Sequence, residues 1–469
     1  MISVLLNFIY FVLLLVLSPV IFYRVVFLKK YREGWTIKLF GQTPNLPPLG
    51  KTPHSNACVQ KTKRVWLHAV SVGEINLLKP LLCRIAEKHP DWECVISTTS
   101  ATGFAVAQKN YGANYGVFYA PLDFSWAVRN ALWRIKPTML ILAEQEIWPN
   151  LLLFCKRQNI PVALINGRLS ENGYKRYRKI RGLWRFVMRR LDLVCVQSET
   201  YSEWFREIGA KPESIHVVGS LKFDNAQTDR DNPTTQKLRR LANISSSDIV
   251  FLAGSTQEPE EELAVETWLA LREQYENLRL ILVPRHPERF DTVANMLDRR
   301  LGNSPKYWRR RSSFHETLSA SVVSSAEHSL PNDAINATSN DTANDKANNV
   351  PLLVDTVGEL GAWWGTSHIA FVGGSMGTRG GQNMLEPAAY NAAVCFGANT
   401  KNFRDIVSLM LAENAAVVVH DGVELTQFTA RCLADPAFAE SLGNRASQLV
   451  CRHLGATERT IELLEKLMT

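Results

Sequence analysis

The sequence lacks the paired cysteines that bind zinc. Its cysteines lie far apart, and none forms a CxxC pair or a cluster with histidines at metal-ligand spacing; they stand at 58, 83, 94, 155, 195, 395, 432 and 451. Because a structural zinc ion needs four closely placed ligands, we expect no metal site. Scattered cysteines are typical of small apolar core residues in a reduced, intracellular protein.

Charge is missing from the first 23 residues. Ile2 to Phe22 is nearly all Leu, Val, Ile, Phe and Tyr, which is long enough to cross a bilayer. A cleaved signal peptide would begin with a basic region and end in small residues, and the sequence shows neither. We therefore expect residues 1–30 to form a single-pass membrane anchor, with an interfacial helix as the alternative. Basic residues follow directly (Arg24, Lys29, Lys30, Arg32), which places the rest of the chain on the cytoplasmic side.

Acidic residues are outnumbered by basic ones, 45 against 53, which gives a formal charge of +8. Such a balance indicates an anionic partner, whether nucleic acid, nucleotide or anionic lipid. The excess is greatest in residues 166–190, where nine Lys or Arg and several aromatic residues accompany one acid, Glu171. Beside an apolar N-terminal segment, this composition favours anionic membrane lipid over nucleic acid as the partner of residues 166–190.

Two successive sets of short apolar runs alternate with longer helical stretches. Such runs are typical of strands in a parallel α/β sheet with helices on both faces. The first set lies at 65–70, 93–99, 138–144, 162–166, 193–198 and 216–219, and the second at 248–255, 278–285, 350–356, 368–374, 392–397 and 415–419. We predict two Rossmann-like doubly wound domains, 31–235 and 236–469, with the last helix free to pack back on the first. Residues 312–349, poor in apolar side chains, are predicted to form a disordered insertion.

Acidic residues stand where strands of the first domain are predicted to end. Glu74 follows the first strand and would lie in the first turn of a helix, where the helix dipole stabilises a carboxylate. Glu144 and Glu146 follow the third strand, and because strand side chains alternate, only one of the two can face a shared site. Each acid fits two roles, a catalytic group at the carboxyl edge of a sheet or an ordinary acid at a helix start.

In the second domain, glycines and basic residues follow the predicted strands. Residues 254–256 (GST) precede an acid-rich helix start, an arrangement suited to binding an anion through backbone N–H groups. Arg285 follows the next strand, where a guanidinium can hold phosphate. The segment 373–386 combines two glycine pairs with a helix expected to open near Gln382, and Glu386 would accept hydrogen bonds from ribose hydroxyls.

Ordered motifs along the chain resemble those of the bacterial 3-deoxy-D-manno-octulosonic acid (Kdo) transferases. The resemblance covers about residues 20–465 except the insertion, and rests on SVGE (71–74), AEQEIWPNLL (143–152), NGRLS (166–170), VVGSLKFD (217–224), GST (254–256), PRHPERF (284–290), DTVGEL (355–360), GGQNMLEPAA (380–389) and NF (402–403). Members of this family are inner-membrane enzymes of the two-Rossmann-domain GT-B type. They use CMP-Kdo to glycosylate the lipid A precursor, lipid IVA, with inversion at the anomeric carbon.

The resemblance implies roles for particular residues. Glu74 would be the general base, and Glu144 and Lys222 would stabilise the transition state. The second domain would bind CMP-Kdo through Arg285, His286, Val357, Gly358, Glu359, Asn383, Met384, Leu385 and Glu386. CMP-Kdo is then a substrate, so no cofactor or metal is expected. The implied partners are CMP-Kdo, lipid IVA and anionic membrane lipid, and not nucleic acid.

The chain departs from the family pattern near the donor motifs. Gln257 and Gln382 stand where members usually have His, Pro259-Glu260 replaces a Gly-Glu pair, and Gly397-Ala398-Asn399 replaces Gly-Pro-His. Glutamine can donate a hydrogen bond to phosphate but carries no charge. Two other functions stay open from the sequence, an enzyme resembling nucleotide-sugar epimerases of the same fold and a non-catalytic, membrane-tethered protein that binds anions.

Overall fold

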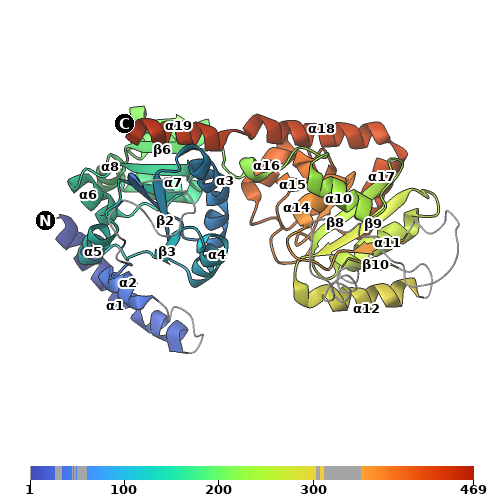
Figure 1. Ribbon diagram of the computed structural model, residues 1–469, viewed down its shortest axis with the longest axis horizontal. Helices are drawn as coiled ribbons and strands as arrows, with labels where there is room; N and C mark the ends of the chain where they lie inside the picture. The colour runs from blue at the N-terminus through green and yellow to red at the C-terminus, as the bar shows by residue number, and fades with distance from the viewer. Residues whose placement is uncertain are drawn as a thin grey trace, which may run out of the picture. The chain divides into compact units, whose positions relative to one another are not determined.

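The computed structural model describes residues 2–26, 34–44, 46, 49, 61–302, 307–310 and 350–468. It contains two compact units, unit 1 (Met1–Asn225 with His453–Thr469) and unit 2 (Ala226–Arg452), shown in Figure 1. The boundary expected at 235/236 falls inside α10 (Pro233–Leu241) and is corrected to 225/226. The reason is packing: Thr235 of α10 is fully buried and its hydroxyl donates to the Ala362 carbonyl of unit 2. The predicted insertion at 312–349 lies outside the described residues.

Seven parallel strands form the sheet of unit 1, in the order β3-β2-β1-β4-β5-β6-β7. Their bounds are β1 Lys63–His68, β2 Trp92–Thr98, β3 Gly116–Tyr119, β4 Met139–Ala143, β5 Val162–Gly167, β6 Leu193–Val196 and β7 Ile215–Val217. The strand order reverses direction between β1 and β4, so the loops after these two strands diverge to opposite faces. Such a switch point is where open α/β sheets bind ligands.

Helices cover both faces of this sheet, which explains why its central strands β1, β4 and β5 are buried along nearly their whole length. One core lies under α5, α6, α8 and α9, and the other under α3, α4 and α19. The helices of unit 1 are α1 Ile2–Val26, α2 Trp35–Phe40, α3 Val72–Lys88, α4 Ala101–Tyr111, α5 Ser125–Ile135, α6 Pro149–Arg157, α7 Glu171–Lys179, α8 Arg181–Met188, α9 Glu199–Glu207 and α19 Ala456–Met468, with 3-10 turns η1 Pro212–Ser214 and η2 Phe223–Asn225.

Unit 2 repeats the architecture with a parallel sheet in the order β10-β11-β9-β8-β12-β13-β14. The strands are β8 Ile249–Thr256, β9 Leu278–Pro284, β10 Trp308–Arg309, β11 Leu352–Leu353, β12 Ile369–Val372, β13 Ala393–Gly397 and β14 Val417–Val419. The helices are α10, α11 Glu260–Leu271, α12 Phe290–Leu301, α14 Leu360–Trp363, α15 Leu385–Ala389, α16 Arg404–Ala412, α17 Gly422–Ala434 and α18 Pro436–His453, with η3 Pro287–Arg289 and η4 Trp364–Thr366. Its switch point lies between β8 and β12. Two doubly wound α/β units are thus confirmed.

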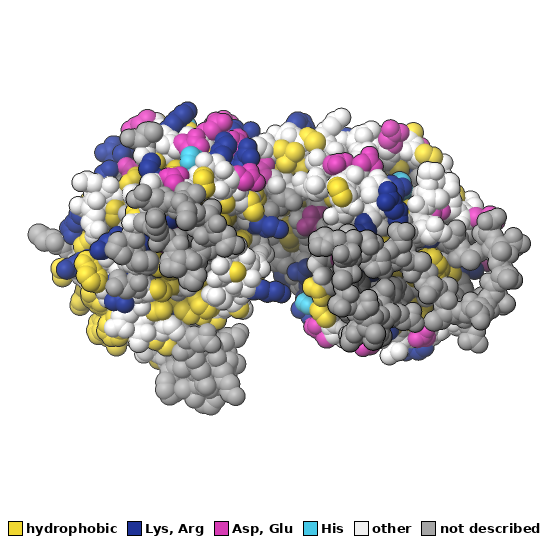
Figure 2. Space-filling model, in the orientation of Figure 1, with side chains coloured by type: hydrophobic (Ala, Val, Ile, Leu, Met, Phe, Trp, Pro, Cys, Tyr) yellow, Lys and Arg dark blue, Asp and Glu magenta, His cyan; other side chains and the backbone are white. Residues whose placement is uncertain are grey.

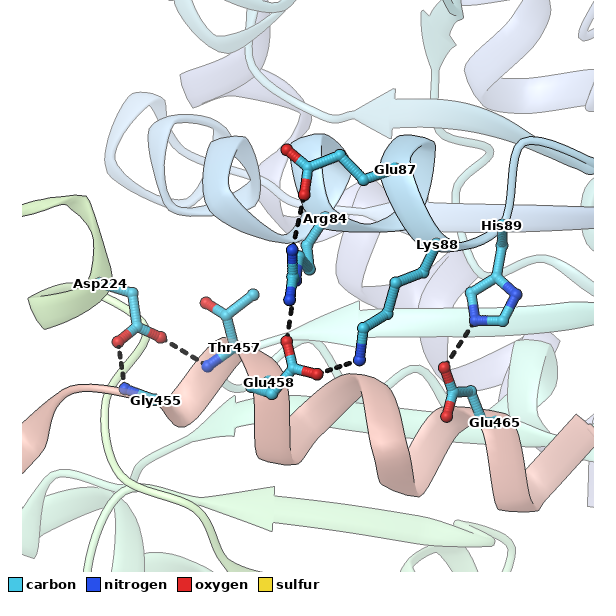
Figure 3. Close-up of polar contacts among 9 residues, drawn as sticks. All are labelled: Arg84, Glu87, Lys88, His89, Asp224, Gly455, Thr457, Glu458 and Glu465. Carbon is cyan, nitrogen blue, oxygen red and sulfur yellow. Dashed lines mark hydrogen bonds and ion pairs between the residues drawn. The ribbon is translucent and has the colours of Figure 1, made fainter.

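The last helix, α19, belongs to unit 1 although it follows all of unit 2 in sequence (Figure 3). Asp224 accepts hydrogen bonds from the backbone N–H groups of Gly455 at 2.7 Å and Thr457 at 2.5 Å, which caps the N-terminus of α19. Glu458 then pairs with Arg84 and with Lys88 of α3. Because Asp224 lies two residues after Lys222, this cap also fixes the loop that carries Lys222.

We expect Asp224→Ala to loosen α19. A charged cap on two backbone donors is worth about 1–2 kcal/mol, which corresponds to roughly ten-fold faster amide exchange. Hydrogen–deuterium exchange of peptides from residues 455–468 measures this directly. Glu458→Gln is the matched control, since exposed ion pairs contribute under about 1 kcal/mol. Equal acceleration in the two variants would contradict the assigned role of Asp224.

Candidate active site

Glu74 lies in the first turn of α3, directly after β1 at the switch point of unit 1. Ser71 caps this helix, its hydroxyl oxygen accepting from the Glu74 N–H at 3.3 Å. The Glu74 carboxylate in turn accepts from the Ser71 hydroxyl at 2.8 Å and from the Val70 N–H at 2.9 Å. This reciprocal arrangement is a capping box, which holds the carboxylate in one orientation.

The electrostatic surroundings make Glu74 a stronger base than an exposed glutamate. Partial burial raises the pKa of Glu74, against the lowering effect of its hydrogen bonds from Val70 and Ser71. The nearby Glu144 charge raises the pKa further, and Arg168 lowers it. A carboxylate whose pKa is shifted towards neutrality accepts a proton more readily, which suits a general base.

Glu144 follows β4, the strand next to β1, and its side chain is buried. Its backbone is left-handed, with φ 55°, a conformation that costs a residue with a Cβ of order 1–3 kcal/mol. This geometry turns the carboxylate towards two cations, Arg168 with Nε at 2.8 Å and Lys222 with Nζ at 3.7 Å. The structure therefore brings together Glu74, Glu144 and Lys222, the residues predicted to be catalytic.

Asn166 and Arg168 complete this cluster, although neither is predicted from the sequence to lie in the site. Asn166 is fully buried at the end of β5 and also has a left-handed backbone, with φ 52°. Its amide nitrogen lies 3.4 Å from Glu144 Oε1, and its amide oxygen accepts from the Leu221 N–H at 3.1 Å. Arg168 had been counted with the basic segment 166–190. The available signal was the NGRLS motif itself, which places both residues at the carboxyl end of a strand.

Glu146 adds a third carboxyl group to the same edge. Burial raises the pKa of Glu146 to about 7, the charges of Glu74 and Glu144 raise it as well, and a hydrogen bond from the Trp148 indole opposes them. Arg168 and Lys222 both contact Glu144. The cluster thus holds three carboxyl groups whose charges interact, and burial and the neighbouring charges raise the pKa of two of them, Glu74 and Glu146.

The basic segment 166–190 forms α7 and α8 and the strand end before them. Its aromatic residues turn inward, because Tyr174 stacks on Trp204 and Tyr177 stacks on Trp184. Its exposed side chains are mostly basic: Lys175, Arg176, Arg178, Lys179, Arg181, Arg185 and Arg189. Lys175 pairs with Glu171, and Arg178 lies 3.8 Å from Glu207. The outer surface of this segment is therefore cationic rather than aromatic.

In unit 2, a buried carboxylate binds backbone donors of the loops after β8 and β12. Glu260, 1% exposed, accepts hydrogen bonds from four N–H groups at 2.7–2.9 Å; the donors are Gln257, Gly374, Ser375 and Met376. None of these four donors belongs to residues 254–256, so phosphate binding by the N–H groups of residues 254–256 stays a prediction. β8 runs through Thr256, and the internal carboxylate joins the loops after β8 and β12.

Gln257 and Gln382, the two glutamines that replace the usual histidines, both lie beside Gly374 of the loop after β12. A Cβ at Gly374 would lie 3.2 Å from Gln382 Nε2 and 3.6 Å from Gln257 Nε2, and its φ of 66° also favours glycine. The helix expected to open near Gln382 begins later, at Leu385, and is five residues long. Two amide groups, rather than a helix terminus, are thus the polar groups at this position.

Arg285, Asn383 and Glu386 are brought together. Burial raises the pKa of Glu386, and the hydrogen bond from Asn383, at 3.0 Å, and the charge of Arg285 oppose this shift. Arg285 is exposed at the end of β9, the neighbour of β8. A cation and an oriented carboxylate at one sheet edge can bind a phosphate and a hydroxyl-bearing sugar respectively.

Other residues predicted to contact the donor differ in what they can offer. Met384 and Leu385 are 0% and 1% exposed, so their side chains belong to the core and only their backbone could meet a ligand. Val357 and Gly358 form an exposed turn, and His286 lies 3.8 Å from Glu288. The Glu359 carboxylate accepts from the Thr356 hydroxyl, the Trp363 indole and the guanidinium of Arg310, which holds the turn in place.

Comparison with known proteins shows the family to which this chain belongs. A family model described as 3-deoxy-D-manno-octulosonic-acid transferase (kdotransferase) matches residues 43–225. The transferase of that name from Chlamydia trachomatis serovar A is 31% identical over 81% of this chain and 78% of its own. That of Bordetella pertussis is 30% identical over 86% of both chains. This chain belongs to the Kdo transferase family.

Among solved structures, UDP-GlcNAc 2-epimerase from Neisseria meningitidis bound to UDP-GlcNAc matches 86% of this Kdo transferase family member and all of its own chain. The TM-score is 0.53 and the identity 14%, which shows a shared fold of GT-B type and nothing about the substrate. The fold and family expected from the sequence are both confirmed.

The raised pKa of Glu146 predicts a pH-dependent stability in this Kdo transferase family member. A carboxyl whose pKa rises from 4.5 to about 7 on folding stabilises the protein below pH 4.5, and that contribution is lost as pH rises to about 7. Glu146→Gln, neutral at every pH, should therefore raise Tm at pH 8 by about 2–4 °C relative to the parent and change it little at pH 5. Glu203→Gln, at an exposed position on α9, is the control. A Glu146→Gln gain that is equal at both pH values would refute this assignment.

Proposed function

We propose that this Kdo transferase family member transfers Kdo from CMP-Kdo to the lipid A precursor, lipid IVA, with Glu74 as the general base. One observation carries the assignment within the chain. A carboxylate with a raised pKa is held by a capping box at the switch point of unit 1, next to the Glu144 cluster. The family supports the donor sugar and the class of reaction.

The proposed step balances in the following way. Glu74 removes the proton from an acceptor hydroxyl, and the oxygen forms a bond to the anomeric carbon of Kdo. The bond from that carbon to the phosphate oxygen breaks, and CMP leaves with the electron pair. Attack opposite the leaving group inverts the anomeric centre. Lys222 and Arg168 supply positive charge where negative charge develops, an electrostatic effect that a preorganised site delivers without rearrangement.

Unit 2 supplies the groups proposed to bind the donor. Arg285 would bind the phosphate, and Glu386, oriented by Asn383, would accept hydrogen bonds from ribose hydroxyls. Gln257 and Gln382 would donate amide N–H groups to the donor where other members place histidine. A neutral amide donor leaves more of the phosphate charge to Arg285, so this guanidinium carries a larger share of donor binding.

A lipid-borne acceptor suits the surface of unit 1. The helix α1 is apolar, and the exposed side chains of α7 and α8 are mostly basic. Lipid IVA carries phosphate groups, and basic side chains draw phosphorylated and anionic lipids towards a protein. We therefore propose that residues 166–190 face anionic lipid at the cytoplasmic side of the inner membrane.

The capping box offers a sharp test of the base. Glu74→Gln keeps a capping side chain, since glutamine serves at this position as well, but removes the base. We expect kcat to fall by about 10²–10⁴-fold with little change in Tm. The assay measures CMP release from CMP-Kdo with lipid IVA, and mass spectrometry of the product shows how many Kdo residues were added.

Ser71→Ala is the matched control, because it breaks the cap and keeps the carboxylate. It should lower Tm more than Glu74→Gln does and lower kcat far less. Near-parental turnover of Glu74→Gln would disprove the base assignment. Absence of any Kdo-bearing product from the parent enzyme would disprove the proposed acceptor.

A further inference from the structure

The N-terminal helix α1 presents one face to unit 1 along much of its length. Its first 18 residues are long and apolar enough to cross a membrane, judged by length and composition alone. Within them, the partly covered positions are Ser3, Leu6, Asn7, Tyr10 and Leu14. This spacing of three and four residues places all of them on one side of a helix. The rest of the surface is apolar and exposed, with Val4 70% and Phe8 65% exposed.

Polar contacts fasten the covered face to α5 and α6. The Asn7 amide donates to the Ser125 hydroxyl at 2.7 Å, and its oxygen accepts from the Ser125 N–H at 3.0 Å and from the Asn150 amide at 3.3 Å. The Tyr10 hydroxyl donates to Asp123 Oδ2 at 2.8 Å. Asp123 and Asn150 are buried and also bonded to each other through backbone groups, so α1 completes a network that belongs to unit 1.

These contacts are incompatible with a lone transmembrane span. A helix that crosses the membrane by itself leaves the globular unit at one end, and its first turns lie beyond about 30 Å of hydrocarbon. Asn7 and Tyr10 lie in the first turns of α1, yet both bind side chains of unit 1. With that face docked, α1 runs along the surface of the unit.

The surface beside α1 has the composition of a membrane interface. On α5, the exposed side chains Trp126, Arg129 and Trp133 recur at intervals of three or four residues and so share one face, and the exposed Lys136 follows directly after the helix. Phe40, at the end of α2, is 54% exposed, and Trp126 donates its indole N–H to the neighbouring Leu39 carbonyl. In Figure 2, hydrophobic side chains gather over α1 and α5 at the lower left of unit 1. Tryptophan with Arg and Lys is characteristic of the bilayer–water boundary.

We propose that α1 does not cross the bilayer but lies in its cytoplasmic interface, docked on α5 through Asn7 and Tyr10, so that α1 and the exposed face of α5 together form one membrane-binding surface. The partner is the lipid bilayer itself. A run of 23 residues without charge, continued by Trp126 and Trp133, matches lipid better than a protein partner, whose contact surface would carry polar groups at its rim. This inference concerns attachment alone and does not depend on the donor or acceptor.

Depth-dependent quenching separates the two orientations. The full-length chain, with Cys58, Cys83 and Cys451 replaced by Ser, receives one cysteine at Val4, Phe8, Leu15, Arg129 or Trp133 and a bimane label. It is reconstituted into vesicles of phosphatidylethanolamine and phosphatidylglycerol that carry a nitroxide at shallow or deep acyl positions. Val423→Cys, exposed on α17 of unit 2, is the unquenched control.

An in-plane α1 predicts the same shallow depth for labels at positions 4, 8 and 15, together with at least two-fold quenching at 129 and 133. A depth that changes steadily from position 4 to 15, with labels on α5 unquenched, would overturn the proposal in favour of a span. Labels on α1 that no lipid quencher reaches would overturn it in favour of a protein partner.

Asn7→Leu combined with Tyr10→Phe removes the docking contacts. This double variant should at least halve quenching at 129 and 133 while α1 stays in lipid. If labels at 129 and 133 were quenched as strongly in this double variant as in the protein with native Asn7 and Tyr10, the docking role of these two residues would be refuted.

Discussion

The carboxylate of Glu144 is the point on which the geometry of unit 1 depends. It is buried, it follows a central strand, and its backbone is left-handed. Burial and the left-handed backbone are each unfavourable alone. They persist because Asn166 and Arg168, at the end of β5, and Lys222, in the loop 219–225, bind the carboxylate. The ends of β4 and β5 and the loop 219–225 are therefore held together, and Glu74, in the first turn of α3 after β1, takes part of its electrostatic surroundings from Glu144 and Arg168.

In unit 2, a second buried carboxylate holds together the loops at the carboxyl edge of the sheet. The Glu260 carboxylate accepts hydrogen bonds from N–H groups of two loops. The fit leaves no space, since a Cβ at Gly373 would lie 2.6 Å from Thr256 Cα and 2.8 Å from Glu260 Oε2. Both sheets thus have an acidic side chain that organises the loops at the switch point. In each unit, the residues assigned to substrate stand beside this organising acid.

Patterns local in sequence predicted the architecture well. Apolar runs and helical stretches located six of the seven strands of each sheet and missed the edge strands β3 and β10, and the motif at 71–74 placed Glu74 after β1. What could not be predicted depends on contacts between distant segments. Arg168 was assigned to a basic surface because its partner Glu144 lies on another strand. The hydrogen bonds of the buried Glu260 were not predicted, because its donor Gly374 is far from it in sequence. The shift in the pKa of Glu146 likewise arises from burial and from Glu74, neither of which composition reveals.

The return of residues 453–469 to unit 1 has a consequence for synthesis on the ribosome. Unit 2 is continuous in sequence, whereas unit 1 lacks α19 until residues 456–468 have been translated, after all of unit 2. Until then, the sheet face that Ile461 and Leu464 of α19 cover is exposed. Its apolar residues on β4, β5 and β6 are accessible to solvent or chaperones. The domain that begins first is therefore finished last, and a premature stop after residue 452 would leave this face exposed permanently.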